Sequence, residues 1–147
     1  MRLGTGSRGA GSAAERAALA AALGDPLLEL IPLKNLADQV PHLPAGARVS
    51  VTASPAKGIE ATLDWSATLA ADGFRVTPHL SARMVRDRGH LADLLVRARE
   101  AGLDHAFIVG GDAEEPGDYP DGLSLLRAMA ELGHPFTTLG CPAYPEG

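Results

Sequence analysis

The stretch "FRVTPHLSARMVRDRGHLADLLVRAREAGLDHAFIVGG", residues 74–111, carries the pattern that decides the fold. Its first segment, 74–81, follows the glycine that ends the preceding predicted helix, and we predict a strand there. Residues 89–102 place apolar side chains at helical spacing and end in glycine, and an apolar strand is predicted at 105–111. Two strands joined by one helix in this way are typical of a parallel βαβ unit.

The same alternation extends along the chain in both directions. Toward the N-terminus, strands are predicted at 27–33 and 48–54, with a helix at 59–73. Toward the C-terminus, a helix is predicted at 121–133 and a fifth strand at 135–144. We therefore predict an α/β fold in which parallel strands alternate with helices along a single sheet.

The N-terminal region differs in composition from the rest. Residues 1–24 are predicted to form a mobile tail followed by a helix, and residues 25–147 form the domain of βα repeats. The tail contains Gly4-x-Gly6-x-x-Gly9, which has the spacing of a dinucleotide-binding loop. Because that loop requires a preceding strand and only three residues precede Gly4, we do not assign it to a cofactor.

Composition and charge argue against several classes of protein. The 147 residues are 46% hydrophobic and 21% charged, an ordinary balance for one globular domain. The net charge is -5 with the basic residues scattered, so nucleic-acid binding is not expected. No apolar run approaches the roughly 20 residues of a membrane span. The single cysteine, Cys141, fits a reducing cytoplasm.

Polar residues occur where the predicted strands end, at the edge where parallel α/β folds bind ligands. Glu29 lies within an apolar strand; it is either a solvent-facing or ion-paired residue, or a partly buried carboxyl whose pKa is raised by desolvation for general-acid chemistry. His79 follows Thr77 and Pro78; it is either a structural hydrogen-bonding residue or a donor to a ligand.

The fourth strand ends in Gly110-Gly111-Asp112, the sharpest of these signals. Two glycines allow close backbone approach and unusual dihedral angles, and their amides can face a ligand. The alternative is an ordinary turn in which Asp112 acts as a cap. The histidines show no metal-ligand spacing and Cys141 has no thiol partner, so no metal is expected.

In series, five stretches resemble the methylenetetrahydrofolate reductase family of flavin-dependent (β/α)8 barrels. They are "LELIPLKN" (28–35), "VSVTAS" (49–54), "VTPHLSAR" (76–83), "IVGGDAEEP" (108–116) and "CPAYPEG" (141–147). The resemblance implies reduction of 5,10-methylenetetrahydrofolate to 5-methyltetrahydrofolate, or the reverse reaction. It implies FAD as cofactor, with FMN as the alternative, and NADH or NADPH as co-substrate.

The resemblance also implies roles for individual residues. Glu29 corresponds to the general acid that protonates the folate as its methylene bridge opens to an iminium. Asp112 lies near the flavin ring and the pterin, where it tunes the flavin and helps to position folate. The remaining residues correspond to positions around the flavin: Thr52, His79, Gly110, Gly111, Tyr119 and Tyr144.

Two departures from the family pattern bear on these expectations. Gly110 stands where the family usually has arginine, which removes a partner for Asp112 or for a flavin phosphate. A complete barrel takes about 250 residues, and five strands cannot close an eight-stranded barrel. We therefore expect the first part of a barrel that is inactive alone and needs a missing C-terminal half or a homo-oligomer. The alternative is a non-catalytic half-barrel that binds a ligand or a partner through its sheet edges.

Overall fold

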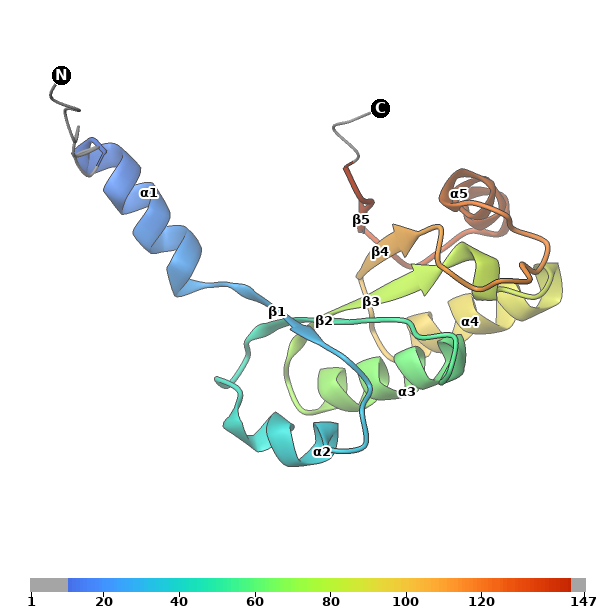
Figure 1. Ribbon diagram of the computed structural model, residues 1–147, viewed down its shortest axis with the longest axis horizontal. Coiled ribbons are helices and arrows are strands. Elements are labelled where there is room, and N and C mark those ends of the chain that lie inside the picture. The colour runs from blue at the N-terminus through green and yellow to red at the C-terminus, as the bar shows by residue number, and fades with distance from the viewer. Residues whose placement is uncertain (1–10, 144–147) are drawn as a thin grey trace, which may run out of the picture.

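The computed structural model describes residues 11–143 and confirms the predicted α/β fold. Five strands form one sheet in the order β1-β2-β3-β4-β5, and every neighbouring pair is parallel (Figure 1). The strands are β1 (Leu27–Leu30), β2 (Arg48–Val51), β3 (Arg75–Ser81), β4 (His105–Val109) and β5 (Thr138–Gly140). All except β3 end before their predicted C-terminal residue, because the residues that follow belong to loops.

Helices connect the strands as predicted. The elements are α1 (Ala13–Gly24), α2 (Leu36–Gln39), α3 (Gly58–Ala71), α4 (Arg88–Glu100) and α5 (Gly122–Leu132), with the 3₁₀ turns η1 (Val40–His42) and η2 (Ala82–Met84). The short α2 and η1 were not predicted, since neither is long enough to show a period. In the part of the chain described, no helix combines the length and apolar character needed to cross a membrane.

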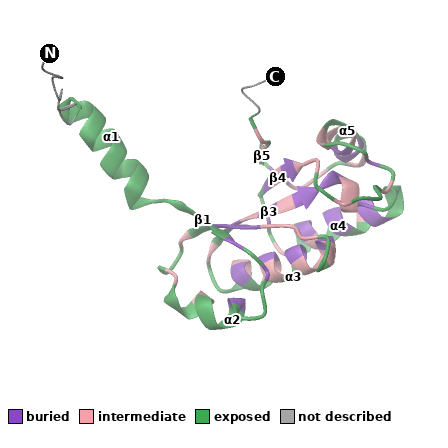
Figure 2. Cartoon of the chain, viewed as in Figure 1, coloured by how far each residue is buried: buried purple, intermediate pink, exposed green. Residues whose placement is uncertain are grey.

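Side-chain caps fix where α1, α4 and α5 begin, whereas α3 has no side-chain cap. Asp87 accepts a hydrogen bond from the amide of His90 at 2.8 Å and starts α4, and Asp121 accepts one from the amide of Ser124 at 2.8 Å and starts α5. Ser12 and Glu15 form a capping box at α1. Helix α1 has no buried residue and extends away from the sheet (Figure 2). The predicted tail, including Gly4, lies largely outside the described residues.

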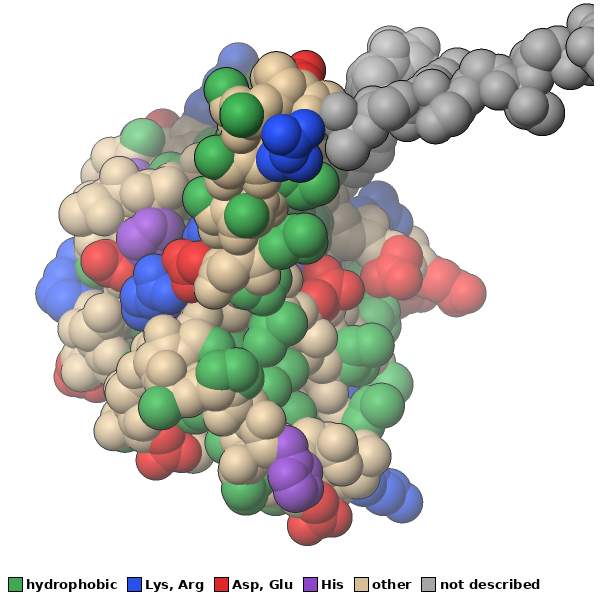
Figure 3. All heavy atoms as spheres, turned by 90° about the vertical axis from the view of Figure 1, so that its left-hand side faces the viewer, with side chains coloured by type: hydrophobic (Ala, Val, Ile, Leu, Met, Phe, Trp, Pro, Cys, Tyr) green, Lys and Arg blue, Asp and Glu red, His purple; other side chains and the backbone are tan. Residues whose placement is uncertain are grey.

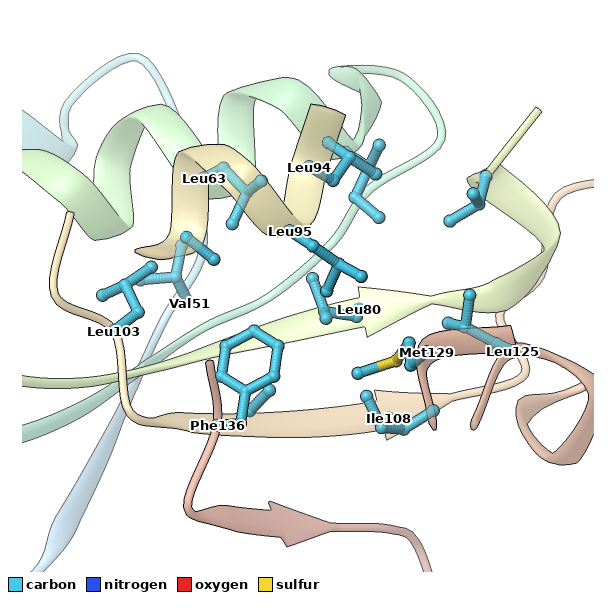
Figure 4. Packing of buried hydrophobic residues seen from close by; sticks show 14 of the residues in the cluster. Val51, Leu63, Leu80, Leu94, Leu95, Leu103, Ile108, Leu125, Met129 and Phe136 are labelled. Atoms are coloured by element: carbon cyan, nitrogen blue, oxygen red, sulfur yellow. The ribbon is translucent and has the colours of Figure 1, made fainter. Parts of the chain in front are cut away.

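One face of the sheet is covered by the helices. Sequential order and right-handed crossovers place α3, α4 and α5 on the same side, and each contacts the next. Strand residues on this face are buried between sheet and helices: Val49, Val51, Val76, Pro78, Leu80, Ala106 and Ile108. Figure 4 shows Leu80 and Ile108 among helical residues such as Leu95 and Met129. This packing forms the hydrophobic core.

The other face of the sheet, here called the open face, carries the alternate strand residues. Strand side chains point to opposite faces in turn, so the register places Glu29, Ser50 and Thr77 side by side on this face. The same rule adds His79 and its cross-strand neighbour Phe107. Four of these five side chains are exposed or half-buried, whereas Ser50 is buried. No described helix covers this row.

The assignment of the two faces is tested by neighbouring residues on β4. Ile108→Ala should lower the free energy of unfolding by about 2–5 kcal/mol, because it removes a buried side chain from the core. Val109→Ala, on the half-exposed open face, should cost no more than about 1 kcal/mol. Urea unfolding of both variants measures the difference, and equal losses would contradict the assignment.

Candidate functional site

Glu29 on β1 and His79 on β3 lie on the same open face of the sheet, with β2 between them. Burial lowers the pKa of His79 below its ordinary value, and the carboxylate of Glu29 acts in the opposite direction, raising it. The two groups therefore lie close enough to interact electrostatically. Because burial dominates, His79 is neutral near pH 7, and a neutral imidazole can both donate and accept a hydrogen bond.

The structure decides between the two alternatives left open for Glu29. The side chain is exposed and faces solvent, so it is not the partly buried carboxyl. The physical reason is that β1 is the edge strand of the described sheet and the open face has no cover, so water reaches the side chain. Exposure also leaves this carboxylate accessible to a ligand that approaches the open face.

An aromatic surface adjoins the pair of ionisable groups. The imidazole of His79 and the ring of Phe107 lie with their centroids 5.0 Å apart and tilted by 39°. Both side chains are half-buried, so each keeps part of its ring surface exposed. Two neighbouring rings of this kind offer a planar ligand stacking and edge contacts.

The loop after β4 begins at the same edge of the sheet. Gly111 has φ of +85°, and a Cβ at this position would lie 1.8 Å from Oγ of Ser81. Gly111 therefore meets both a conformational and a steric requirement for glycine. The Ser81 hydroxyl below it is buried and has no hydrogen-bond partner among residues 11–143. Gly110 has an ordinary backbone conformation, and Asp112 is exposed.

The remaining predicted residues divide between the site and the core. Thr52 lies at the C-terminal end of β2, where its amide donates to the carbonyl of Leu30 at 2.9 Å. Tyr119 is buried in the hydrophobic core, near Arg88 and Glu131 of the helices that flank it, so the structure does not bring it to Glu29 and His79. Burial raises the pKa of Tyr119 above its ordinary value. Tyr144 lies outside the described residues.

Sequence reasoning assigned no role to three residues that now border the site: Ser50, Phe107 and Arg83. Two of them were visible in the alternation of the strands. Phe107 stands between buried Ala106 and Ile108, and Ser50 between Val49 and Val51, so each occupies the opposite face. No sequence signal marked Arg83, since its partners are backbone carbonyls 30 and 31 positions away.

A pocket of about 460 Å³ lies at the rim formed by the loops after β2, β3 and β4. Among its lining residues, Glu60 contacts Arg86 at 3.0 Å and lies 3.1 Å from Nε2 of buried His90. The hydrogen bond from its own backbone amide contributes most to lowering the pKa of Glu60, and Arg86 and His90 lower it less. Nδ1 of His90 accepts a hydrogen bond from the Arg86 amide, so the neutral ring carries its proton on Nε2.

The described residues contain no group of three or more His, Cys, Asp or Glu side chains that could hold a metal ion. Compared with models of known protein families, the sequence matches none. What the geometry offers is a carboxylate, a neutral imidazole and an aromatic ring on one sheet face, beside a glycine loop.

The demand for glycine at position 111 gives a matched pair of variants. Gly111→Ala should lower the free energy of unfolding by about 1–3 kcal/mol, because alanine is strained at positive φ and its Cβ displaces Ser81 Oγ. Gly110→Ala meets no atom within 4 Å and should change it by less than about 0.5 kcal/mol. Denaturant unfolding compares the two, and an equal effect would show that this loop conformation is wrong.

Proposed function

We propose that this chain provides the flavin- and folate-binding part of a cytoplasmic, methylenetetrahydrofolate reductase-like oxidoreductase. The observation that carries the proposal is the strand register, which places Glu29 and His79 on the same open face of the sheet. Both residues belong to the series of stretches that resembles the family. The exposed thiol of Cys141 fits the reducing compartment that the proposal assumes.

The side chains on the open face fit a flavin ring. His79 and Phe107 offer aromatic surface, and Gly111 presents backbone without a side chain at the neighbouring loop. Thr52 and Gly110 complete the set of proposed FAD contacts. When bound, the flavin supplies hydride transfer between NADH or NADPH and the one-carbon unit of folate. Because the protein carries neutral His79 there, the imidazole can hydrogen-bond a ring carbonyl or nitrogen.

Glu29 and Asp112 are the ionisable groups proposed to act on folate. Glu29 is exposed on the open face, so its carboxyl group can reach a folate nitrogen and take part in proton transfer as the methylene bridge opens. In the opposite direction the same carboxylate accepts that proton. Asp112 is exposed at the adjoining loop, where its negative charge helps to position the pterin and to tune the flavin.

A second candidate function is binding of a partner chain without catalysis. Within residues 11–143, β1 and β5 are the outer strands of the sheet and pair with one neighbour each. Apolar side chains also gather on the α1 side of the molecule (Figure 3), including the exposed Leu19, Leu23 and Leu27. Unpaired edges and exposed apolar surface favour association with another copy or with a chain that continues the sheet.

Titration of the purified protein with FAD separates the two functions. We expect FAD binding, seen as quenched flavin fluorescence, and a loss of about fivefold in affinity for His79→Ala, since aromatic contacts contribute about 1 kcal/mol. His105→Ala is the matched control. This exposed histidine is the first residue of β4, away from the edge of the sheet where the strands end. Its affinity should match the wild type.

Glu29→Gln completes the test. This variant should bind FAD within about twofold of wild type, yet slow folate turnover by about a hundredfold or more in the active assembly, because it removes a proton donor. A folded wild-type protein that takes up no FAD would refute the flavin proposal and favour partner binding. Unchanged folate turnover would remove Glu29 from the reaction.

A further inference from the structure

The loop between β4 and α5 lies directly on the segment that follows β3. At Gly117, an added Cβ would come within 2.1 Å of the Val85 carbonyl oxygen and 2.6 Å of the Arg86 Cα. The next amide, that of Asp118, donates to the Arg86 carbonyl at 2.9 Å. The far end of the loop is therefore pressed against the β3–α4 connection, just as Gly111 is pressed against Ser81 at the near end.

Arg83 lies between these two points of contact and bonds to the loop along its length. Its backbone amide donates to the Gly110 carbonyl at 3.0 Å, and its carbonyl accepts from the Gly117 amide at 3.2 Å. Its guanidinium donates from Nε to the Ala113 carbonyl at 2.7 Å and from Nη2 to the Glu114 carbonyl at 2.8 Å. One residue thus holds both ends and the middle of the loop.

The two guanidinium bonds require an arginine. Nε and Nη2 form a rigid planar fork, which can donate to two successive carbonyls at once, whereas a lysine ammonium is a single point on a flexible stem. The Arg83 side chain is half-buried. The Arg83 guanidinium reaches this loop from η2, the turn that directly follows β3.

We propose that Arg83 is a positioning residue that holds Gly110, Gly111 and Asp112 in a ligand-ready arrangement at the sheet edge. The inference deepens the proposed function and rests on it for the identity of the ligand, FAD. Arg83 uses its donors on backbone carbonyls, so it acts through the loop. A preformed loop binds more tightly because less ordering is required at the moment of binding.

The test combines amide hydrogen exchange with FAD titration on Arg83→Ala, Arg83→Lys and the control Arg99→Ala. Arg99 also donates to a backbone carbonyl, that of Gly133 at 3.3 Å, but at the C-terminal end of α4. For both Arg83 variants we expect the bonded amides of Gly117 and Asp118 to exchange at least about tenfold faster and FAD affinity to fall by about tenfold. Added methylguanidinium should partly restore affinity to Arg83→Ala. The control should match wild type.

The outcomes separate the inference from the function on which it rests. Unchanged exchange of the Gly117 and Asp118 amides in Arg83→Ala overturns the inference, as does faster exchange with undiminished FAD affinity. Full FAD affinity in Arg83→Lys also overturns it, because charge alone would then suffice. If wild type binds no FAD while exchange still rises in Arg83→Ala, the flavin proposal fails and the assignment of Arg83 to the loop stands.

Discussion

Parallel pairing of β3 with β2 and β4 places Thr77 and His79 on one face of the sheet and Val76, Pro78 and Leu80 on the other. The positions of the hydrophobic core and of the polar face both follow from this register. The apolar set meets α3, α4 and α5 and forms the core, so the polar set is fixed on the opposite face. A shift of one residue would bury His79 in the core and expose Leu80, which the core does not permit.

Several features at the C-terminal edge of the strands are unfavourable for the stability of the fold or restrict which residue is tolerated. The Ser81 hydroxyl is buried without a described hydrogen-bond partner, and such groups generally cost about 1–3 kcal/mol. Gly111 above it adopts a conformation that other residues rarely adopt. Burial also works against protonation of His79. Features of this kind cluster at functional sites, and here they surround the loop that Arg83 holds.

The sequence predicted the fold better than the site, for physical reasons. The spacing of apolar residues and the glycines at helix ends predicted the strands and the longer helices, because these signals depend on local geometry. The edge position that exposes Glu29 and the core packing that buries Tyr119 depend on neighbours distant in sequence, and no pattern in either segment reports them. The role of Arg83 could not be predicted for the same reason, since its guanidinium bonds to backbone carbonyls that lie 30 and 31 positions away in the sequence.

The electrostatic interaction between Glu29 and His79 links the two ionisable groups of the open face, and NMR titration of the His79 imidazole tests it directly. Its resonance would be followed against pH in wild type and in Glu29→Gln. Because the Glu29 carboxylate raises the pKa of His79 while burial lowers it, neutralising that carboxylate should lower this pKa further. An unchanged or higher pKa in Glu29→Gln would show that the two side chains do not interact on the open face.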